Sequence, residues 1–302
     1  MKYLNKNIYF FVITFLTITN FNAQNLASLI EKYNENKNDE AIILEIGKKY
    51  ADKKNWEKSI EYFQKLVDIN PNNPEYLYRL GGTQAAYSQD ISKLRVLNLI
   101  NKAKSNLIKS ANLDKKNINS RWVLVQIFSE LPSIVGGDLK KASIYTDEIF
   151  RISKIHGLLS KHYLFGIKKD FKKQSELEKQ IFTYAKKNKP KFKFNYFNFK
   201  MGSILMNNFN EYELAKSYFN QYLNKLSSAD RISKSVIYYN LANCSYFTKD
   251  NKSEYYLNKS LKYLRKSEKD YYDLKSKIDL LSKNLKNWEY TLLQLGEQSC
   301  TI

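Results

Sequence analysis

Hydrophobic residues recur three and four positions apart along almost the whole chain, and this spacing predicts an all-α protein. Only 9 Gly and 4 Pro interrupt the pattern in 302 residues. The first clear pair of helices covers about Glu40–Lys53 and about Trp56–Ile69. Pro71 follows the second helix and stops it, because proline cannot continue a helix. The pattern therefore predicts short helices joined by tight turns.

The apolar positions of this first pair return with a fixed period. Leu77, Leu80 and Gly81 follow their counterparts by 34 residues each. The counterparts and their neighbours in the first pair are Ile43, Ile46, Gly47, Tyr50, Ser59, Phe63 and Pro71. This arrangement resembles the tetratricopeptide repeat, a helix–turn–helix unit of about 34 residues that reads W-x2-L-G-x2-Y, then A-x3-F, then P.

The resemblance implies a right-handed α-solenoid of about six helix pairs with capping helices. We expect the solenoid over residues 39–266, an N-terminal capping helix within 24–38, and a C-terminal capping helix and tail within 267–302. The capping helices are expected at about Leu26–Tyr33 and about Tyr271–Leu285. The fourth pair, about Lys154–Ile167 and Phe171–Lys187, follows the repeat pattern least well.

Two further segments depart from a regular repeat. An insertion in the second pair predicts one long helix of about Ile91–Asn112. In the third pair, Pro132 stops a helix, the glycines that follow permit positive φ, and Asp138 caps the next helix. The turn from Pro132 to Asp138 resembles one found in exported bacterial tetratricopeptide proteins, including repeat components of periplasmic solute-transport systems.

The N-terminus has the pattern of a secretory signal peptide. Lys2 and Lys6 precede an apolar run from Ile8 to Ile18, and a short polar stretch leads to Ala23. A basic start, an apolar core of about 7–15 residues and a small residue at the exit are typical of such signals. We therefore expect residues 1–23 to be removed and the protein to be exported, periplasmic or extracellular; an uncleaved anchor is the alternative.

The basic charge is concentrated in one region. The chain carries a formal net charge of +20, and Arg151 to Lys200 alone accounts for +11. The densest stretch interleaves aromatic residues with five lysines: Lys186, Lys187, Lys189, Lys191 and Lys193. We expect these lysines and Phe192 to be exposed and to bind an anionic lipid or an acidic glycan; export argues against nucleic acid. A solvated loop is the alternative.

Motifs for catalysis, cofactors and metals are missing from the sequence. His156 and His162 are six residues apart, so they lie on different sides of a helix, unlike a metal-binding pair one turn apart. We expect both histidines to be solvated or structural. Cys244 lies in an apolar helix pattern and is expected to be a buried hydrophobe, with a disulfide to Cys300 as the alternative. The sequence therefore predicts a protein without enzymatic activity, cofactor or metal.

Binding is the function that the resemblance implies, because the first helices of such repeats line a concave groove. Extending the repeat register gives the groove-facing residues Glu45, Lys48, Tyr78, Arg79, Tyr239, Asn240, Asn243 and Tyr246. Aromatic rings with Arg and Asn suit recognition of a peptide, although the rings could instead fill space between helices. We expect a scaffold that binds a protein or peptide. The alternatives are an envelope-surface or polyanion-binding protein that uses residues 186–193, and a subunit of a periplasmic solute uptake system.

Overall fold

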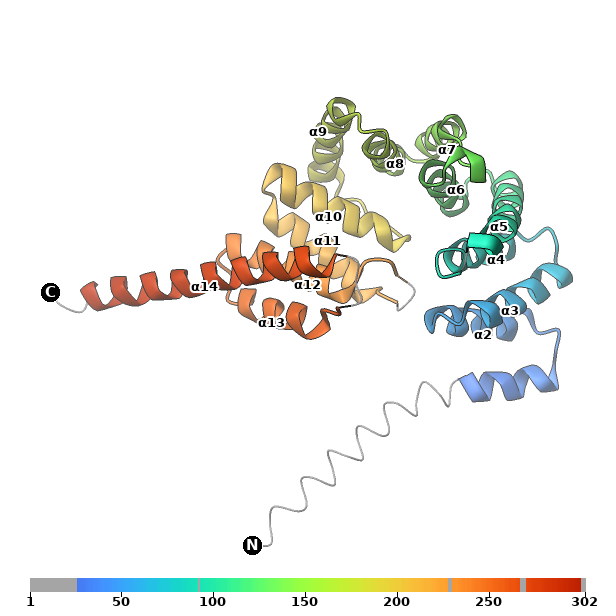
Figure 1. The fold of residues 1–302 in the computed structure, drawn as a ribbon, viewed down its shortest axis with the longest axis horizontal. Helices are drawn as coiled ribbons and strands as arrows, with labels where there is room; N and C mark the ends of the chain where they lie inside the picture. Colours follow the sequence, from blue (N-terminus) through green and yellow to red (C-terminus); the bar gives the residue numbers. More distant parts are fainter. Residues whose placement is uncertain (1–25, 92, 228–229, 267–269, 300–302) are drawn as a thin grey trace, which may run out of the picture. The chain divides into compact units, whose positions relative to one another are not determined.

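The computed structural model describes residues 26–91, 93–227, 230–266 and 270–299, and these residues are helical with connecting turns and no strand (Figure 1). The expected signal peptide and Cys300 lie outside the described residues. The chain forms two compact units, one up to Tyr145 and one from Thr146 onward. Each unit is a run of consecutive helices that pack on their neighbours, so the all-α expectation is confirmed.

The first unit opens with a helix over residues 26–35, the expected N-terminal cap. The helices that follow are α2 (Glu40–Asp52), α3 (Trp56–Ile69), α4 (Pro74–Tyr87), α5 (Lys93–Leu113) and α6 (Ile118–Glu130). A 3-10 turn, η1 (Ser133–Val135), leads into α7 (Leu139–Ile152), which continues into the second unit. The single long helix α5 confirms the insertion expected in the second pair.

Side-chain caps fix where these helices begin. The Asp39 carboxylate accepts hydrogen bonds from the backbone N–H groups of Ala41 and Ile42 at 3.0 Å, and Asn73 caps α4 in the same way. Such caps satisfy N–H groups that have no partner within the helix. Pro74 occupies the first turn of α4, where its missing N–H costs nothing.

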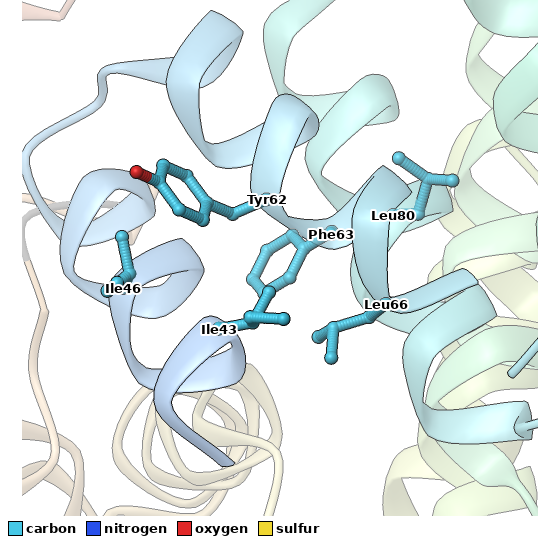
Figure 2. Close-up of a cluster of buried hydrophobic side chains, with 6 residues drawn as sticks. All are labelled: Ile43, Ile46, Tyr62, Phe63, Leu66 and Leu80. Atoms are coloured by element: carbon cyan, nitrogen blue, oxygen red, sulfur yellow. The ribbon is translucent and has the colours of Figure 1, made fainter. Parts of the chain in front are cut away.

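The core of the first repeat is apolar and tightly packed (Figure 2). Its buried members are Ile43, Ile46, Tyr62, Phe63, Leu66 and Leu80. The helix over residues 26–35 covers this cluster with Leu26, Leu29, Ile30 and Tyr33. A Cβ added at Gly47 would lie 2.5 Å from a Phe63 ring carbon, so only glycine lets α2 and α3 approach this closely.

The turn between α6 and α7 has the expected construction. Gly136 adopts φ +89°, and a side chain at Gly137 would run into the backbone carbonyl of Leu131. The Asp138 carboxylate caps α7 by accepting hydrogen bonds from the N–H groups of Lys140 and Lys141 at 2.9 and 3.0 Å. Gly136 is therefore required for its backbone conformation, and Gly137 because a side chain there has no space.

The second unit continues the pairing after α7. Its helices are α8 (Lys154–Ile167), α9 (Phe171–Asn188), α10 (Asn195–Phe209), α11 (Tyr212–Asn224), α12 (Lys234–Phe247), α13 (Ser253–Tyr263) and α14 (Tyr271–Ser299). The first helices of successive pairs also contact one another, α8 with α10 and α10 with α12. In the fifth pair, a Cβ at Gly202 would lie 2.8 Å from the Phe219 ring, so this pair repeats the contact of Gly47 with Phe63.

Helix α14 covers the open end of the second unit. Leu274, Ile278, Leu281 and Leu285 are buried in one cluster with Ala242 of α12 and Leu257 of α13. The expected C-terminal capping helix is therefore present, and it extends past Leu285 to Ser299.

Candidate functional site

In the first unit, the predicted groove residues form two local ion pairs. Lys48 Nζ lies 2.7 Å from Glu45 Oε1 on α2. Arg79 Nε donates to Glu75 Oε1 at 2.7 Å on α4, and its guanidinium lies 5.6 Å from the centre of the Tyr78 ring. Burial raises the pKa of the Tyr78 hydroxyl above its ordinary value. The α4 surface thus presents an aromatic ring beside a partly exposed arginine.

In the second unit, the predicted groove residues mostly serve packing. Tyr239 and Tyr246 are half-buried against the cluster that joins α12, α13 and α14. Asn243 Nδ2 lies 3.7 Å from Met206 Sδ of α10. Asn240 is only 7% exposed, so the expectation that it faces a partner is wrong. The reason is that α12 packs on α11 and α13 and also contacts α10 and α14, so neighbours cover much of its surface.

The basic stretch, which begins in the last turn of α9 and continues past its end, keeps its five lysines exposed. Lys186 forms an ion pair with Glu211 at 2.8 Å and lies over the Phe182 ring. Lys187, Lys189, Lys191 and Lys193 form no ion pair with a described residue. We call these five lysines the basic segment.

Phe192 departs from expectation, because it is buried at 1% exposure. The stretch between α9 and α10 has no regular secondary structure, and it places Phe192 inward while Lys191 and Lys193 on either side stay exposed. The Phe192 ring packs against His156 and Phe197, and Lys225 donates to its carbonyl oxygen at 2.9 Å. Phe192 therefore anchors the segment and leaves Lys191 and Lys193 in solvent.

A buried polar pair joins α8, α9 and α10, and sequence reasoning did not identify it. His162 Nε2 lies 2.8 Å from Glu178 Oε1, and Asn208 donates to Glu178 Oε2 at 2.8 Å. The His162 residue is 2% exposed, and its Nδ1 has no hydrogen-bond partner among the described residues. Lys200 lies close enough to act electrostatically on both His162 and Glu178.

Burial controls the protonation of both histidines. It lowers the pKa of His162 to about 4, and the positive charge of Lys200 adds to this effect. Burial alone lowers the pKa of His156 to about 4; its Nδ1 lies 2.8 Å from Ser153 Oγ. Both imidazoles are therefore neutral at pH 7; His162 is buried and His156 is partly buried.

The described residues offer neither a cluster of metal ligands nor a helix that could cross a membrane. No group of three or more His, Cys, Asp or Glu side chains is placed to hold a metal ion there. Among the described helices, none combines the length and the apolar character needed to cross a membrane. Cys244 is buried, as expected, and burial raises the pKa of its thiol to about 12.

Comparison with known proteins identifies the fold. No protein-family model matches the chain, and no curated protein does. A tetratricopeptide repeat protein from Parabacteroides merdae matches with a TM-score of 0.50 and 7% identity, over 88% of this chain and 94% of that one. Yeast Tom70 matches with a TM-score of 0.49 and 11% identity, over 92% of this chain and 62% of Tom70. The chain therefore has a tetratricopeptide-type helical fold, as the repeat pattern predicted.

Proposed function

We propose that this protein is an exported, non-enzymatic scaffold that binds a protein or peptide through the first helices of its repeats. The observation that carries the proposal is the α4 surface of a tetratricopeptide-type fold. Tyr78, Arg79 and Glu75 are partly exposed there, and an ion pair holds the Arg79 and Glu75 side chains together beside the Tyr78 ring. Tyrosine and arginine are enriched among the residues that contribute most to protein–protein affinity.

The α4 surface suits a peptide because it supplies both apolar area and directional hydrogen bonds. The Tyr78 ring is rigid, so little conformational entropy is lost when a partner packs on it. The Arg79 guanidinium has further N–H donors beyond the one that Glu75 receives. Such donors can pair with backbone carbonyls or carboxylates of an extended chain.

The test is partner capture by the full-length protein from envelope extracts, followed by mass spectrometry. The double variant Tyr78→Ala with Arg79→Ala should recover at least tenfold less of the partner, about 1.4 kcal/mol of binding free energy. The control, Lys58→Ala with Glu61→Ala, removes an exposed ion pair on α3 and should recover the parent amount. Equal recovery by both variants would place the binding surface elsewhere.

Export has its own test. N-terminal sequencing of the native protein should begin at Gln24, after the segment with signal-peptide character. A native protein that keeps Met1 and fractionates with membranes would support the uncleaved anchor.

A second candidate function is binding of an anionic surface by the basic segment, which the exposure of its five lysines favours. Each lysine near an anionic bilayer contributes about 1 kcal/mol, and the attraction weakens as salt rises. Replacing all five lysines with Gln should remove most binding to phosphatidylglycerol vesicles. Unchanged vesicle binding would mean that the basic segment is only a solvated loop.

A further inference from the structure

Four tyrosines other than the predicted groove residues gather on the sixth helix pair, α12 and α13. Tyr238 of α12 stacks on Tyr263 of α13, with ring centres 5.6 Å apart and planes 11° apart. It also lies 6.3 Å from Tyr256, which in turn meets Tyr255 edge-on at 5.4 Å. We call Tyr238, Tyr255, Tyr256 and Tyr263 the tyrosine cluster.

The tyrosine cluster is attached to the core but is not wholly part of it. Tyr256 packs against the buried residues that join α12, α13 and α14. Tyr255 is 54% exposed, and Tyr238 and Tyr263 are half-buried. One ring thus anchors the cluster, and the other three present aromatic surface toward solvent at fixed positions.

The hydroxyl groups of the tyrosine cluster are unused by the protein. None of the four hydroxyls hydrogen-bonds to a residue that the structure describes. A buried or half-buried tyrosine usually finds a partner for its hydroxyl. These four groups, each able to donate and accept, are therefore open to solvent or to a bound molecule.

Two lysines complete the surface. Lys234 Nζ lies 5.2 Å from the centre of the Tyr263 ring, and Lys259 Nζ lies 5.4 Å from that of Tyr255. Neither ammonium forms an ion pair with a described residue. Both ammonium groups therefore lie within cation–π distance of a ring, and no ion pair with a described residue neutralises their charge.

We propose that the tyrosine cluster with Lys234 and Lys259 binds an acidic polypeptide segment. Tyrosines supply large, rigid contact area at low entropic cost, as in antibody binding sites, and their hydroxyls can bond to carboxylates and backbone groups. The two unpaired lysines give charge complementarity to Asp and Glu side chains. An acidic polypeptide fits better than a lipid surface, because its backbone groups and carboxylates can pair with the four hydroxyls as well as with the two ammonium groups.

This inference rests on the proposal that the protein binds other proteins, but it names a different surface and fails separately. Failure of the α4 variants to change partner capture would leave binding at the tyrosine cluster intact. Failure at the tyrosine cluster would leave the α4 surface as the binding site.

The test measures direct binding of a fluorescent random copolymer of glutamate and tyrosine to the full-length protein. Tyr255→Ala with Lys259→Gln should lower the affinity at least tenfold, and Tyr255→Phe, which keeps the ring, should lower it only a few-fold. The matched control is Tyr272→Ala with Lys262→Gln, an exposed tyrosine and an exposed lysine of the same unit outside the cluster. The control should bind as the parent does, and a copolymer of lysine and tyrosine should not bind.

Circular dichroism and urea unfolding of each variant separate lost binding from lost folding. The proposal is overturned if the Tyr255 and Lys259 variant binds the glutamate–tyrosine copolymer as tightly as the Tyr272 and Lys262 control. It is also overturned if polygalacturonate or phosphatidylglycerol vesicles bind in a cluster-dependent way while the copolymer does not. That result would assign the surface to an acidic glycan or a lipid instead.

Discussion

In helix pairs α2–α3 and α8–α9, residues at three equivalent positions of the repeat join the two helices, but the contacts differ in chemistry. In α2–α3, the Ser59 hydroxyl donates to the Gly47 carbonyl 12 residues earlier, and Phe63 packs on Gly47. In α8–α9, Gln174 donates to the carbonyl of His162, again 12 residues earlier. The partner of His162 is Glu178, 16 residues on, the same separation as from Gly47 to Phe63.

The two contacts stabilise their helix pairs in different ways. The glycine–phenylalanine contact stabilises the helix pair by burying apolar area, and this effect needs no particular bond geometry and does not depend on pH. The histidine–glutamate contact is directional and reaches α10 through Asn208, but it takes ionisable groups out of water. The fourth pair should therefore be the part of the second unit most sensitive to single polar substitutions and to acid.

The largest expected effect comes from breaking the apolar contact. Phe63 is 1% exposed, so Phe63→Ala should lower the free energy of unfolding by about 3–5 kcal/mol through lost burial and a residual cavity. Phe171→Ala, at a ring that is 67% exposed, is the control and should change it by less than about 0.5 kcal/mol. Urea unfolding followed by circular dichroism measures both. Similar losses in the two variants would contradict the assigned core.

Breaking the polar contact should have a somewhat smaller effect. Glu178→Gln removes the carboxylate that receives hydrogen bonds from His162 and Asn208 and faces Lys200. We expect a loss of about 1.5–3 kcal/mol, the usual range for a hydrogen bond to a charged group.

A double-mutant cycle with Lys200→Met sharpens this prediction. Removing the buried cation should recover part of the loss, because no charge is then left without its counter-charge. Strictly additive effects of Glu178→Gln and Lys200→Met would show that Lys200 does not act on the pair.

The two contacts differ in how far the sequence could predict them. Gly47 and Phe63 stand in a repeat pattern that combines residue type with period, so both the fold and the close approach were predictable. His162 and Glu178 occupy the same positions with residue types that the pattern does not contain. Only the separation of 16 residues, shared with Gly47 and Phe63, could have revealed the pair, and it required the register of a divergent repeat.

The pH dependence follows from His162. Its pKa is about 4 in the folded protein and about 6.5 when unfolded, so the unfolded chain binds the proton more readily. The contribution of neutral His162 to the free energy of unfolding is therefore fully present above pH 6.5. It falls as the pH drops from there toward 4, by about 2 kcal/mol between pH 7 and pH 5. His156 shifts in the same direction.

His162→Gln should remove about half of the dependence that the two histidines produce together, and His156→Gln should remove a similar share. Urea unfolding at pH 7 and pH 5 measures the difference for each protein. A wild-type dependence that persists unchanged in His162→Gln would show that this histidine is not neutral in the folded state.

The candidate binding residues were less predictable than the fold. Extending the repeat register placed Asn240 on a first helix correctly, but its burial depends on how the neighbouring helices pack on α12. Phe192 was expected in solvent with the lysines around it, yet its ring packs inward against His156 and Phe197. The tyrosine cluster joins residues of two helices up to 25 positions apart, so no local pattern marks it. Exposure is decided by packing partners that a single sequence does not show.

The smallest expected effect concerns two adjacent glycines of α4, at which alanine should change the free energy of unfolding in opposite directions. A Cβ at Gly81 would lie 2.8 Å from Leu107 Cγ and 3.0 Å from the Ala103 carbonyl oxygen, whereas a Cβ at Gly82 would meet only Tyr78 at 3.9 Å. Alanine in place of helical glycine gains about 0.5–1 kcal/mol through lower backbone entropy in the unfolded chain. Gly82→Ala should show this gain, while Gly81→Ala should show a net loss of about 1 kcal/mol because the overpacking cost exceeds it. Thermal and urea unfolding measure the change in stability of each variant relative to the parent. If both are stabilised, α4 and α5 have room to move apart, and the close approach assigned to Gly81 is wrong.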